Sequence, residues 1–336
     1  MQRENMRCPA KALCPAGPAG ATGGEGENMQ ADAQGSTKKK RAVVVIASAL
    51  LALLLALLYI FPRPTGSWPA IFSALGLWPR EAPACPTVTF VDVGQGDCTL
   101  LRNGEHTVLI DTGTDGYSLL RTLRREGVGQ IDALIATHPH ADHIGGMDLI
   151  MEAFAVGRLY VSDMPPADET DAQCYGRMLE AAAAQKVEIS HPKDGGILDI
   201  GGIHLEFFAP LPAAPDENER SLFVRAQLGG ASVLVTGDAG VDAETALLSR
   251  QENMEAAILK VGHHGSSNSS SPAFLRAVAP DYAVISVGVD NAYGHPDAGT
   301  LTRLQNAGAA VLRTDVLGTI RFSVLEDGSV QRTVRE

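Results

Sequence analysis

Residues 131–146 read IDALIATHPHADHIGG. The first seven are mostly apolar and partly β-branched, which predicts a strand, and a helical pattern begins at Asp142. The turn between strand and helix holds three histidines and one aspartate within six residues. Ligand-binding groups in α/β folds gather at the carboxyl ends of strands. This stretch therefore predicts a strand, a site-bearing turn and a helix, which indicates an α/β fold.

The residue types in this turn are those of a metal site. His138 and His140 lie two residues apart, so an extended backbone points both side chains the same way. Asp142 and His143, at the start of the helix, can serve a second ion close by. A lone histidine on a loop is more often structural, but four such groups together predict metal binding. Imidazole and carboxylate ligands favour zinc, manganese or iron over calcium, so we expect one or two divalent ions, Zn²⁺ or Mn²⁺.

Short β-branched runs alternate with helical patterns from Thr87 onward. Strands are predicted over 87–93, 98–102, 107–111, 131–137, 159–162, 204–209, 232–236, 257–261 and 282–287. Helices are predicted over 118–126, 142–153, 172–185, 239–249, 272–278 and 298–307. A meander of three strands comes first, and strands and helices mix afterwards. This order favours a layered body over a simple parallel sheet.

The His-x-His-x-Asp-His pattern is a signature of the metallo-β-lactamase superfamily, and the chain resembles that family in two further motifs. Residues 109–113 read LIDTG and residues 234–238 read LVTGD. The resemblance implies a four-layer αββα sandwich. It also implies that Asp111 orients the histidine loop without binding metal, and that Asp238 bridges two metal ions. Each short motif alone is typical of turns, and their order around the histidine loop is what gives them weight.

Three more stretches resemble the C-terminal domain of ComEC-type competence proteins, in the same order. They are FVDVGQGD at 90–97, LKVGHHGS at 259–266 and NAYGHP at 291–296. The resemblance covers residues 87–336 and implies that His263 or His264 completes the ligands of the second metal; the sequence does not choose between them. It implies no transport of DNA by this chain alone, because only one long hydrophobic run is present. His295 is a candidate general acid or phosphate contact.

Other candidate residues lie in these motifs. Where the wider superfamily carries another metal-binding histidine before the bridging aspartate, this chain has Asn218, which we place beside the metal ligands and which leaves the second metal position a hypothesis. A polar loop after Gly265 could donate hydrogen bonds to phosphate oxygens, or could simply cap a helix that begins at Pro272. The candidates for substrate binding are Gln95, Asp97, Ser266, Ser267 and Asn268.

The composition limits the partners. The chain has 336 residues, 45% of them hydrophobic, and a net charge of −12. An acidic body argues against tight binding of nucleic acid through phosphate contacts alone, because that affinity comes from basic side chains. Five cysteines without a CxxC pair indicate neither a thiolate metal site nor a disulfide framework. Candidates for a local basic groove are Arg102, Arg121, Arg124, Arg125, Lys260 and Arg276.

The N-terminal part has its own organisation. Residues 42–61 are an uncharged apolar run long enough to cross a membrane as a helix, and residues 38–41 are all basic. The positive-inside rule then places residues 1–41, a predicted disordered tail, in the cytoplasm and the hydrolase domain 87–336 outside the cell membrane. The alternative is a cleaved signal peptide. Residues 62–86, with six prolines and two tryptophans, are predicted to be a linker.

These features predict a membrane-anchored, extracytoplasmic metal-dependent hydrolase. Its metal would activate water, and Asp142 or Asp238 would orient that nucleophile. The family resemblance implies a phosphodiester substrate, most simply DNA. A hydrolase of a small ester, lactone or phosphate compound is the alternative, and a catalytically silent surface or assembly protein is a third. No obligate protein partner is inferred.

Overall fold

A computed structural model describes residues 43–53, 82–162, 165–209 and 211–333. The chain divides into two units, Met1–Thr65 and Gly66–Glu336. The predicted tail, most of the predicted linker and the second half of the predicted membrane helix lie outside the described residues.

In the larger unit, the first sheet has eight strands in the order β15-β14-β1-β2-β3-β4-β5-β6. Strands β1 to β3 form the expected antiparallel meander, β3 to β6 run parallel, and β14 returns from the C-terminal end to pair with β1. The strands are β1 (Thr87–Phe90), β2 (Thr99–Asn103), β3 (His106–Ile110), β4 (Gln130–Ala136), β5 (Ala155–Val161), β6 (Glu188–Ser190), β14 (Ile320–Val324) and β15 (Val330–Thr333).

The second sheet has seven strands in the order β13-β12-β11-β10-β9-β8-β7. Strands β7 to β10 are antiparallel, and β10 to β13 are parallel. The strands are β7 (Gly196–Ile200), β8 (Ile203–Phe208), β9 (Phe223–Leu228), β10 (Ala231–Val235), β11 (Ile258–Lys260), β12 (Tyr282–Ile285) and β13 (Ala310–Arg313). Each sheet thus joins an antiparallel half to a parallel half.

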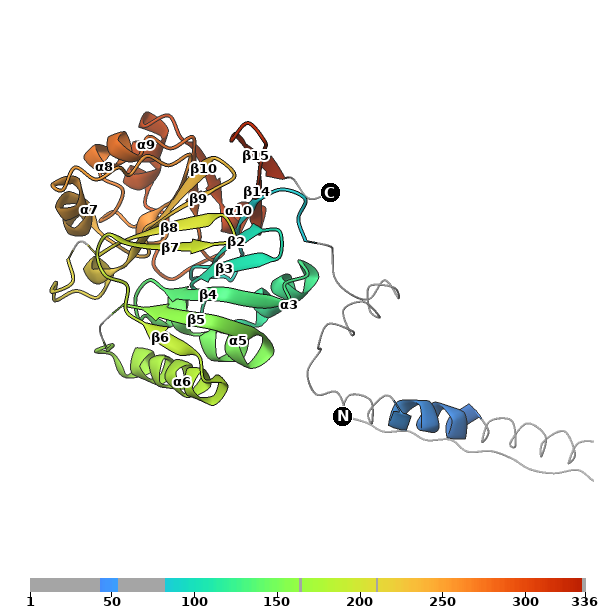
Figure 1. The fold of residues 1–336 in the computed structure, drawn as a ribbon. Helices are drawn as coiled ribbons and strands as arrows, with labels where there is room; N and C mark the ends of the chain where they lie inside the picture. Colours follow the sequence, from blue (N-terminus) through green and yellow to red (C-terminus); the bar gives the residue numbers. More distant parts are fainter. Residues whose placement is uncertain (1–42, 54–81, 163–164, 210, 334–336) are drawn as a thin grey trace, which may run out of the picture. The chain divides into compact units, whose positions relative to one another are not determined.

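Helices cover the outer face of each sheet (Figure 1). The first sheet carries α3 (Tyr117–Arg125), α5 (Met147–Ala153) and α6 (Glu169–Gln185), and the second carries α7 (Val241–Leu248), α8 (Pro272–Val278) and α9 (Ala298–Asn306). Three separate apolar clusters fill the spaces: one between the two sheets, and one between each sheet and its own helices. Two sheets with helices outside them confirm the expected αββα sandwich, because each amphipathic layer needs a neighbour to bury its apolar face.

The single helix predicted over 142–153 is two helices, α4 (Ala141–Ile144) and α5. Gly145 and Gly146 separate them and press against the backbone of Thr114 and Gly116, where any Cβ atom would collide. The close approach of these two backbones ends the first helix and fixes the histidine turn against the β3–α3 loop.

Several short elements escaped sequence prediction: β6, β7, β9, β13, β14, β15 and α10 (Thr314–Leu317). Four of these strands, β6, β7, β13 and β15, contain no fully buried residue, so none of them shows the burial of a central strand. Pairing with neighbouring strands, and not local pattern, makes them strands.

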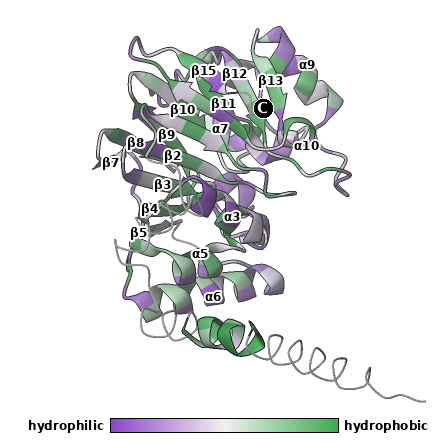
Figure 2. Cartoon of the chain, turned by 90° about the vertical axis from the view of Figure 1, so that its right-hand side faces the viewer, coloured by the Kyte–Doolittle hydropathy of each residue, from purple (hydrophilic) through white to green (hydrophobic). Residues whose placement is uncertain are grey.

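In the smaller unit, residues 43–53 form a helix of hydrophobic residues, coloured green in Figure 2. Among the described residues, no helix combines the length and the apolar character that a membrane crossing requires. The remaining residues of the predicted 42–61 span, residue 42 and residues 54–61, lie outside the described part.

Candidate metal centre

The candidate site lies where both sheets present the carboxyl ends of their strands. The histidine turn follows β4, Asp111 follows β3, Asp238 follows β10 and His264 follows β11. Parallel neighbouring strands end at the same edge of a sheet, so residues distant in sequence come together there. At this edge of the sandwich, side chains that follow strands of the first sheet meet side chains that follow strands of the second.

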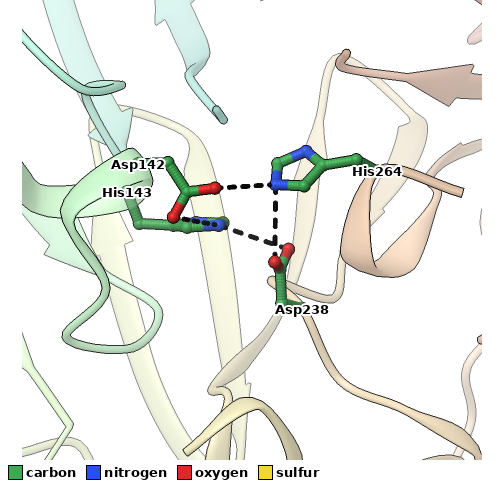
Figure 3. Close-up of side chains that lie close together, drawn as sticks. All are labelled: Asp142, His143, Asp238 and His264. Atoms are coloured by element: carbon green, nitrogen blue, oxygen red, sulfur yellow. Dashed lines mark hydrogen bonds and ion pairs between the residues drawn. The ribbon is translucent and has the colours of Figure 1, made fainter. Parts of the chain in front are cut away.

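Four side chains converge on one point: Asp142, His143, Asp238 and His264 (Figure 3). Their ligand atoms all lie within 4.8 Å of one another. The Nε2 atom of His264 lies 3.1 Å from Oδ2 of Asp142 and 3.4 Å from Oδ2 of Asp238. The Nε2 atom of His143 lies 3.2 Å from Oδ1 of Asp238. Two imidazoles and two carboxylates at this separation are a ligand set for one divalent ion.

Each imidazole in this set is oriented by a hydrogen bond on its other nitrogen. Nδ1 of His143 lies 2.8 Å from Oδ2 of Asp111, a carboxylate that also accepts from the backbone N–H and the hydroxyl of Thr137. Nδ1 of His264 donates to the carbonyl of Ser286 at 2.8 Å. A proton on Nδ1 leaves the Nε2 lone pair facing the centre, which is how metal-binding histidines are generally held.

His138 and His140 lie beside this set. The ring centroids of His138 and His143 are 4.1 Å apart, and those of His138 and His140 are 4.6 Å apart. His138 is completely buried, and its Nδ1 contacts the hydroxyl of Thr137 at 3.2 Å. Nε2 of His140 lies 3.1 Å from a carboxylate oxygen of Glu217. The carboxylate of Glu217 thus contacts one ring nitrogen of His140, as the carboxylate of Asp111 contacts one ring nitrogen of His143.

The buried atoms of the centre fit a divalent cation. Nε2 of His138 is buried without a hydrogen-bond partner among the described residues, and Nε2 of His143 and Oδ1 of Asp238 are buried 3.2 Å apart as an ion pair without a hydrogen bond. Buried polar atoms that lack hydrogen bonds are costly, and a bound cation would satisfy them. Asn218, in the place where a histidine was expected, also has a buried Oδ1 atom without such a partner.

The buried histidines and carboxylates of the centre shift one another's pKa values. Although burial opposes it, the carboxylates around His264, Asp238 first, raise the pKa of His264 to about 10. His143 shows the same effect: its pKa lies well above the ordinary value despite complete burial. Burial raises the pKa of Asp238, but the two imidazoles outweigh that effect and hold it well below its usual range. Burial lowers the pKa of His138 well below its ordinary value, which keeps that ring neutral.

A buried lysine lies behind the centre. The ammonium group of Lys260 is completely buried, forms an ion pair with Asp97, and donates to the carbonyl of Gly237 at 3.2 Å. It also lies 3.8 Å from Oδ1 of Asp238. Lys260 therefore offsets part of the negative charge of the centre.

The burial of Asp97 and Lys260 contradicts two expectations from the sequence. Asp97, expected to bind substrate, is buried against Lys260 and does not line the cavity at the centre. Lys260 and Arg102, offered as members of a basic groove, are both buried, and Arg102 donates to the carbonyl of Glu126. Neither cation can contact a substrate phosphate, because each is already committed inside the fold.

A cavity of about 240 Å³ opens onto the metal centre. Its lining residues are Gln95, His140, Asp142, Asn218, Asp238, His263, His264, Tyr293 and His295. The expected substrate contact Gln95, the candidate proton donor His295 and Asn218, expected beside the metal ligands, all line this cavity. His263 is half-buried, with its Nε2 atom 3.8 Å from Asp238 and its ring 5.8 Å from that of His295. His264 is the better placed of the two adjacent histidines, because it is buried and its Nε2 atom is nearer to Asp238.

The loop of Ser266, Ser267 and Asn268 does not line this cavity. Its polar atoms serve the fold: the carbonyl of Ser266 accepts from Thr300, and the carbonyl of Ser267 accepts from Arg303. The carbonyl of Asn268 accepts from the backbone N–H of Val241. The cap before Pro272 is Ser271, whose hydroxyl accepts from the N–H of Phe274. The geometry therefore favours a structural role for this loop, as the connection into α8, over a role in binding phosphate.

Sequence reasoning gave no role to Glu217, Ser286 or Tyr293. Glu217 stands beside Asn218, in the stretch where a histidine was expected, but nothing local shows that its side chain reaches His140. The contact of Ser286 is a backbone carbonyl, which leaves no trace in the sequence. Tyr293 lies in the NAYGHP motif, which could have drawn attention to it.

This sandwich and its imidazole and carboxylate centre define a metal-dependent hydrolase. The family model described as Metallo-beta-lactamase superfamily matches residues 91–289, more than half of the chain. The chain belongs to this superfamily.

Similar curated proteins include competence proteins. ComE operon protein 3 of Bacillus subtilis is 36% identical over 264 residues, which cover 70% of this chain and 32% of that protein. Competence protein ComA of Neisseria gonorrhoeae is 32% identical over 296 residues, which cover 85% and 40%. These relatives confirm the resemblance to ComEC-type proteins. The chain spans less than half the length of either.

Solved structures with a similar fold include CmlA, described as a diiron beta-hydroxylase from Streptomyces venezuelae, at 16% identity over 76% of this chain and 55% of that chain. Its TM-score is 0.48. YhfI from Bacillus subtilis, described as a metallo-beta-lactamase fold protein, has 14% identity over 74% of this chain and all of that chain, with a TM-score of 0.46. Likeness at this level adds nothing about activity.

Proposed function

We propose that the chain is a metal-dependent phosphodiesterase that acts on nucleic acid, most simply DNA. The observation that carries the proposal is the convergence of Asp142, His143, Asp238 and His264 at the floor of an open cavity. Phosphodiester hydrolysis needs an activated water molecule and a stabilised phosphoryl oxygen, and a divalent ion supplies both when bound. Competence-protein relatives support nucleic acid as the substrate.

The protein's own residues have separate roles in this proposal. Asp142, His143, Asp238 and His264 would hold one ion, and His138 and His140 would be ligands for a second. Asp111 and Glu217 orient His143 and His140. Zn²⁺ and Mn²⁺ both suit imidazole and carboxylate ligands, and Asn218 in place of a histidine weakens the second position.

His295 is placed to move a proton. Its half-buried ring lines the cavity, and burial lowers the pKa of His295 below its ordinary value. A neutral imidazole can accept a proton from the attacking water, and the resulting imidazolium can return one to the leaving oxygen. Asp142 and Asp238, ionised beside the same cavity, orient the water by accepting its hydrogen bonds.

A hydrolase of a small ester, lactone or phosphate compound is a second candidate. It is favoured by the lining of the cavity, where none of the described lysines or arginines appears. A site that grips a polyanion usually presents such cations.

One comparison distinguishes these functions. The full chain, loaded with Mn²⁺ or with Zn²⁺, is incubated with single-stranded DNA, duplex DNA, a generic phosphodiester and a lactone. We expect cleavage of phosphodiesters by the wild type and none by the Asp142→Ala/His143→Ala variant. Lactone hydrolysis without DNA cleavage would select the second candidate. Equal inactivity of both proteins despite bound metal would exclude an enzyme of either kind.

We also propose that residues 42–61 anchor the chain in the cell membrane, with residues 87–336 outside the cytoplasm. The basic residues 38–41 next to an uncharged apolar run support this orientation. Protease added to intact cells should digest the hydrolase domain, and its complete protection in a cell with a single membrane would contradict the proposed orientation.

A further inference from the structure

Tyr293 stands at the rim of the metal-centre cavity with 71% of its surface exposed. Its ring stacks on the ring of His295, with centroids 5.9 Å apart and planes inclined by 15°. The inner face of the stacked pair thus belongs to the cavity lining, and the tyrosine ring presents a further flat apolar surface to solvent. Flat aromatic surfaces of this kind bind other flat rings.

The loop that carries Tyr293 is held in place by Asn291. The side-chain amide of Asn291 donates to the carbonyls of His295 at 2.7 Å and Gly288 at 3.1 Å, and its oxygen accepts from the N–H of His295 at 3.0 Å. Gln95 accepts from the N–H of Gly288 at 3.1 Å and joins the loop to the first sheet. The backbone on both sides of Tyr293 is therefore held, and the contact with His295 is what orients the tyrosine ring.

A second cavity continues the site past Tyr293. It measures about 520 Å³ and shares Gln95, His140, Asp142 and Tyr293 with the cavity at the metal centre. Sites for small ligands have volumes of roughly 300–1,000 Å³, so this space can take a nucleotide. The tyrosine stands between the reacting centre and this additional space.

The charge of the groove sets how a nucleic acid strand can be held. Of the described residues that line the two cavities, none is a lysine or an arginine, and Asp142, Asp171 and Asp238 are acidic. Backbone contacts through basic side chains are therefore lacking at the groove. Base stacking on aromatic rings is the other common source of affinity for single strands, and it tolerates every base.

We propose that Tyr293 is a stacking platform for a nucleobase of single-stranded nucleic acid, next to the linkage held at the metal centre. The inference rests on the proposed phosphodiesterase function and adds a preference for single strands over duplexes. Bases inside a duplex already stack on their neighbours and cannot lie on the tyrosine ring without being extruded. The site therefore selects unpaired nucleotides.

Fluorescence tests the stacking without any need for cleavage. A short phosphorothioate strand with one 2-aminopurine is titrated with the full chain loaded with Mn²⁺. We expect quenching by the wild type, by Tyr293→Trp and by Tyr117→Ala, and loss of quenching in Tyr293→Ala. Tyr117 is the matched control, because it is 64% exposed but lines neither cavity. Equal quenching by the wild type and Tyr293→Ala, or none by the wild type, would overturn the proposal.

Cleavage provides the second measurement. For the wild type, kcat/KM on a strand with a base beside the cleaved linkage should exceed that on an abasic strand by about 5- to 100-fold, the range of one base stack. In Tyr293→Ala this ratio should fall to near one; an unchanged ratio would overturn the proposal. If the wild type cleaves no strand at all, the phosphodiesterase function fails, and the fluorescence titration still decides the stacking.

Discussion

Nδ1 of His143 lies 2.8 Å from Oδ2 of Asp111, in a pair that is completely buried. The two residues come from different strand ends, and Asp111 adopts a left-handed backbone conformation, φ 58°, to reach the imidazole. This hydrogen bond fixes which nitrogen of His143 faces the other ligands. The orientation of the histidine turn therefore depends on a residue that lies outside it.

Replacing Asp111 with Asn should weaken metal binding about 10- to 100-fold, as is usual for partners of metal-binding histidines. Asn tolerates the left-handed conformation, so the change removes the negative charge with little backbone strain. Mn²⁺ affinity of the purified protein, from calorimetric titration, measures the effect. Wild-type affinity in Asp111→Asn would contradict the orienting role.

His264→Asn should lose bound metal, while His263→Asn should keep it. Both residues adopt a left-handed backbone, which Asn accepts, so each substitution is the control for the other. The expected difference follows from the burial of His264 and from its hydrogen bond to Ser286. Elemental analysis after gel filtration gives the metal content. The reverse pattern would identify His263 as the ligand.

Lys260→Met should reduce the free energy of unfolding by about 3–5 kcal/mol, because Asp97 would remain as a buried charge without its partner. Urea denaturation measures the loss. The double variant Lys260→Met/Asp97→Asn should recover a large part of it, since both charges are then gone. Lys193→Ala, at an exposed position, serves as the control. A Lys260→Met protein as stable as the wild type would show that the buried pair contributes nothing.

Metal binding should release protons. Without metal, the pKa of His264 is about 10 and that of His143 is also raised, so both rings are positively charged imidazolium groups at pH 7. A ligand imidazole must be neutral, and metal affinity should therefore rise with pH up to the pKa of His264, about 10. Calorimetry in buffers of different ionisation enthalpy should show at least one proton released per protein. No buffer dependence would refute the expectation.

The same pKa values set the pH dependence of the metal-free fold. The pKa of His264 is higher in the folded protein than in the unfolded chain, so its stabilising effect is complete below about 6.5 and is lost as the pH rises through about 10. Metal-free protein should thus lose stability toward alkaline pH, and His264→Asn should reduce this loss. Thermal denaturation across this range measures both.

Sequence pattern predicted the strands that are buried and the helices that begin with a recognisable cap. Strand β4 and helix α8 are examples, the latter predicted over its observed bounds. Strands such as β7 and β15 were not predicted, because each is half-exposed and becomes a strand only through its neighbours. The break between α4 and α5 depends on a backbone contact with Thr114, which no local pattern shows.

The local sequence was enough to predict metal binding. His138, His140, Asp142 and His143 lie within six residues, so a single turn supplies several imidazole and carboxylate groups of the kind that bind divalent ions. The packing of the two sheets brings His264 closer to Asp238 than His263, keeps Asp97 and the loop of Ser266 out of the cavity lining, and brings Glu217 against His140. Those outcomes depend on which strand ends the two sheets bring side by side, and burial and hydrogen-bond partners exist only after that packing.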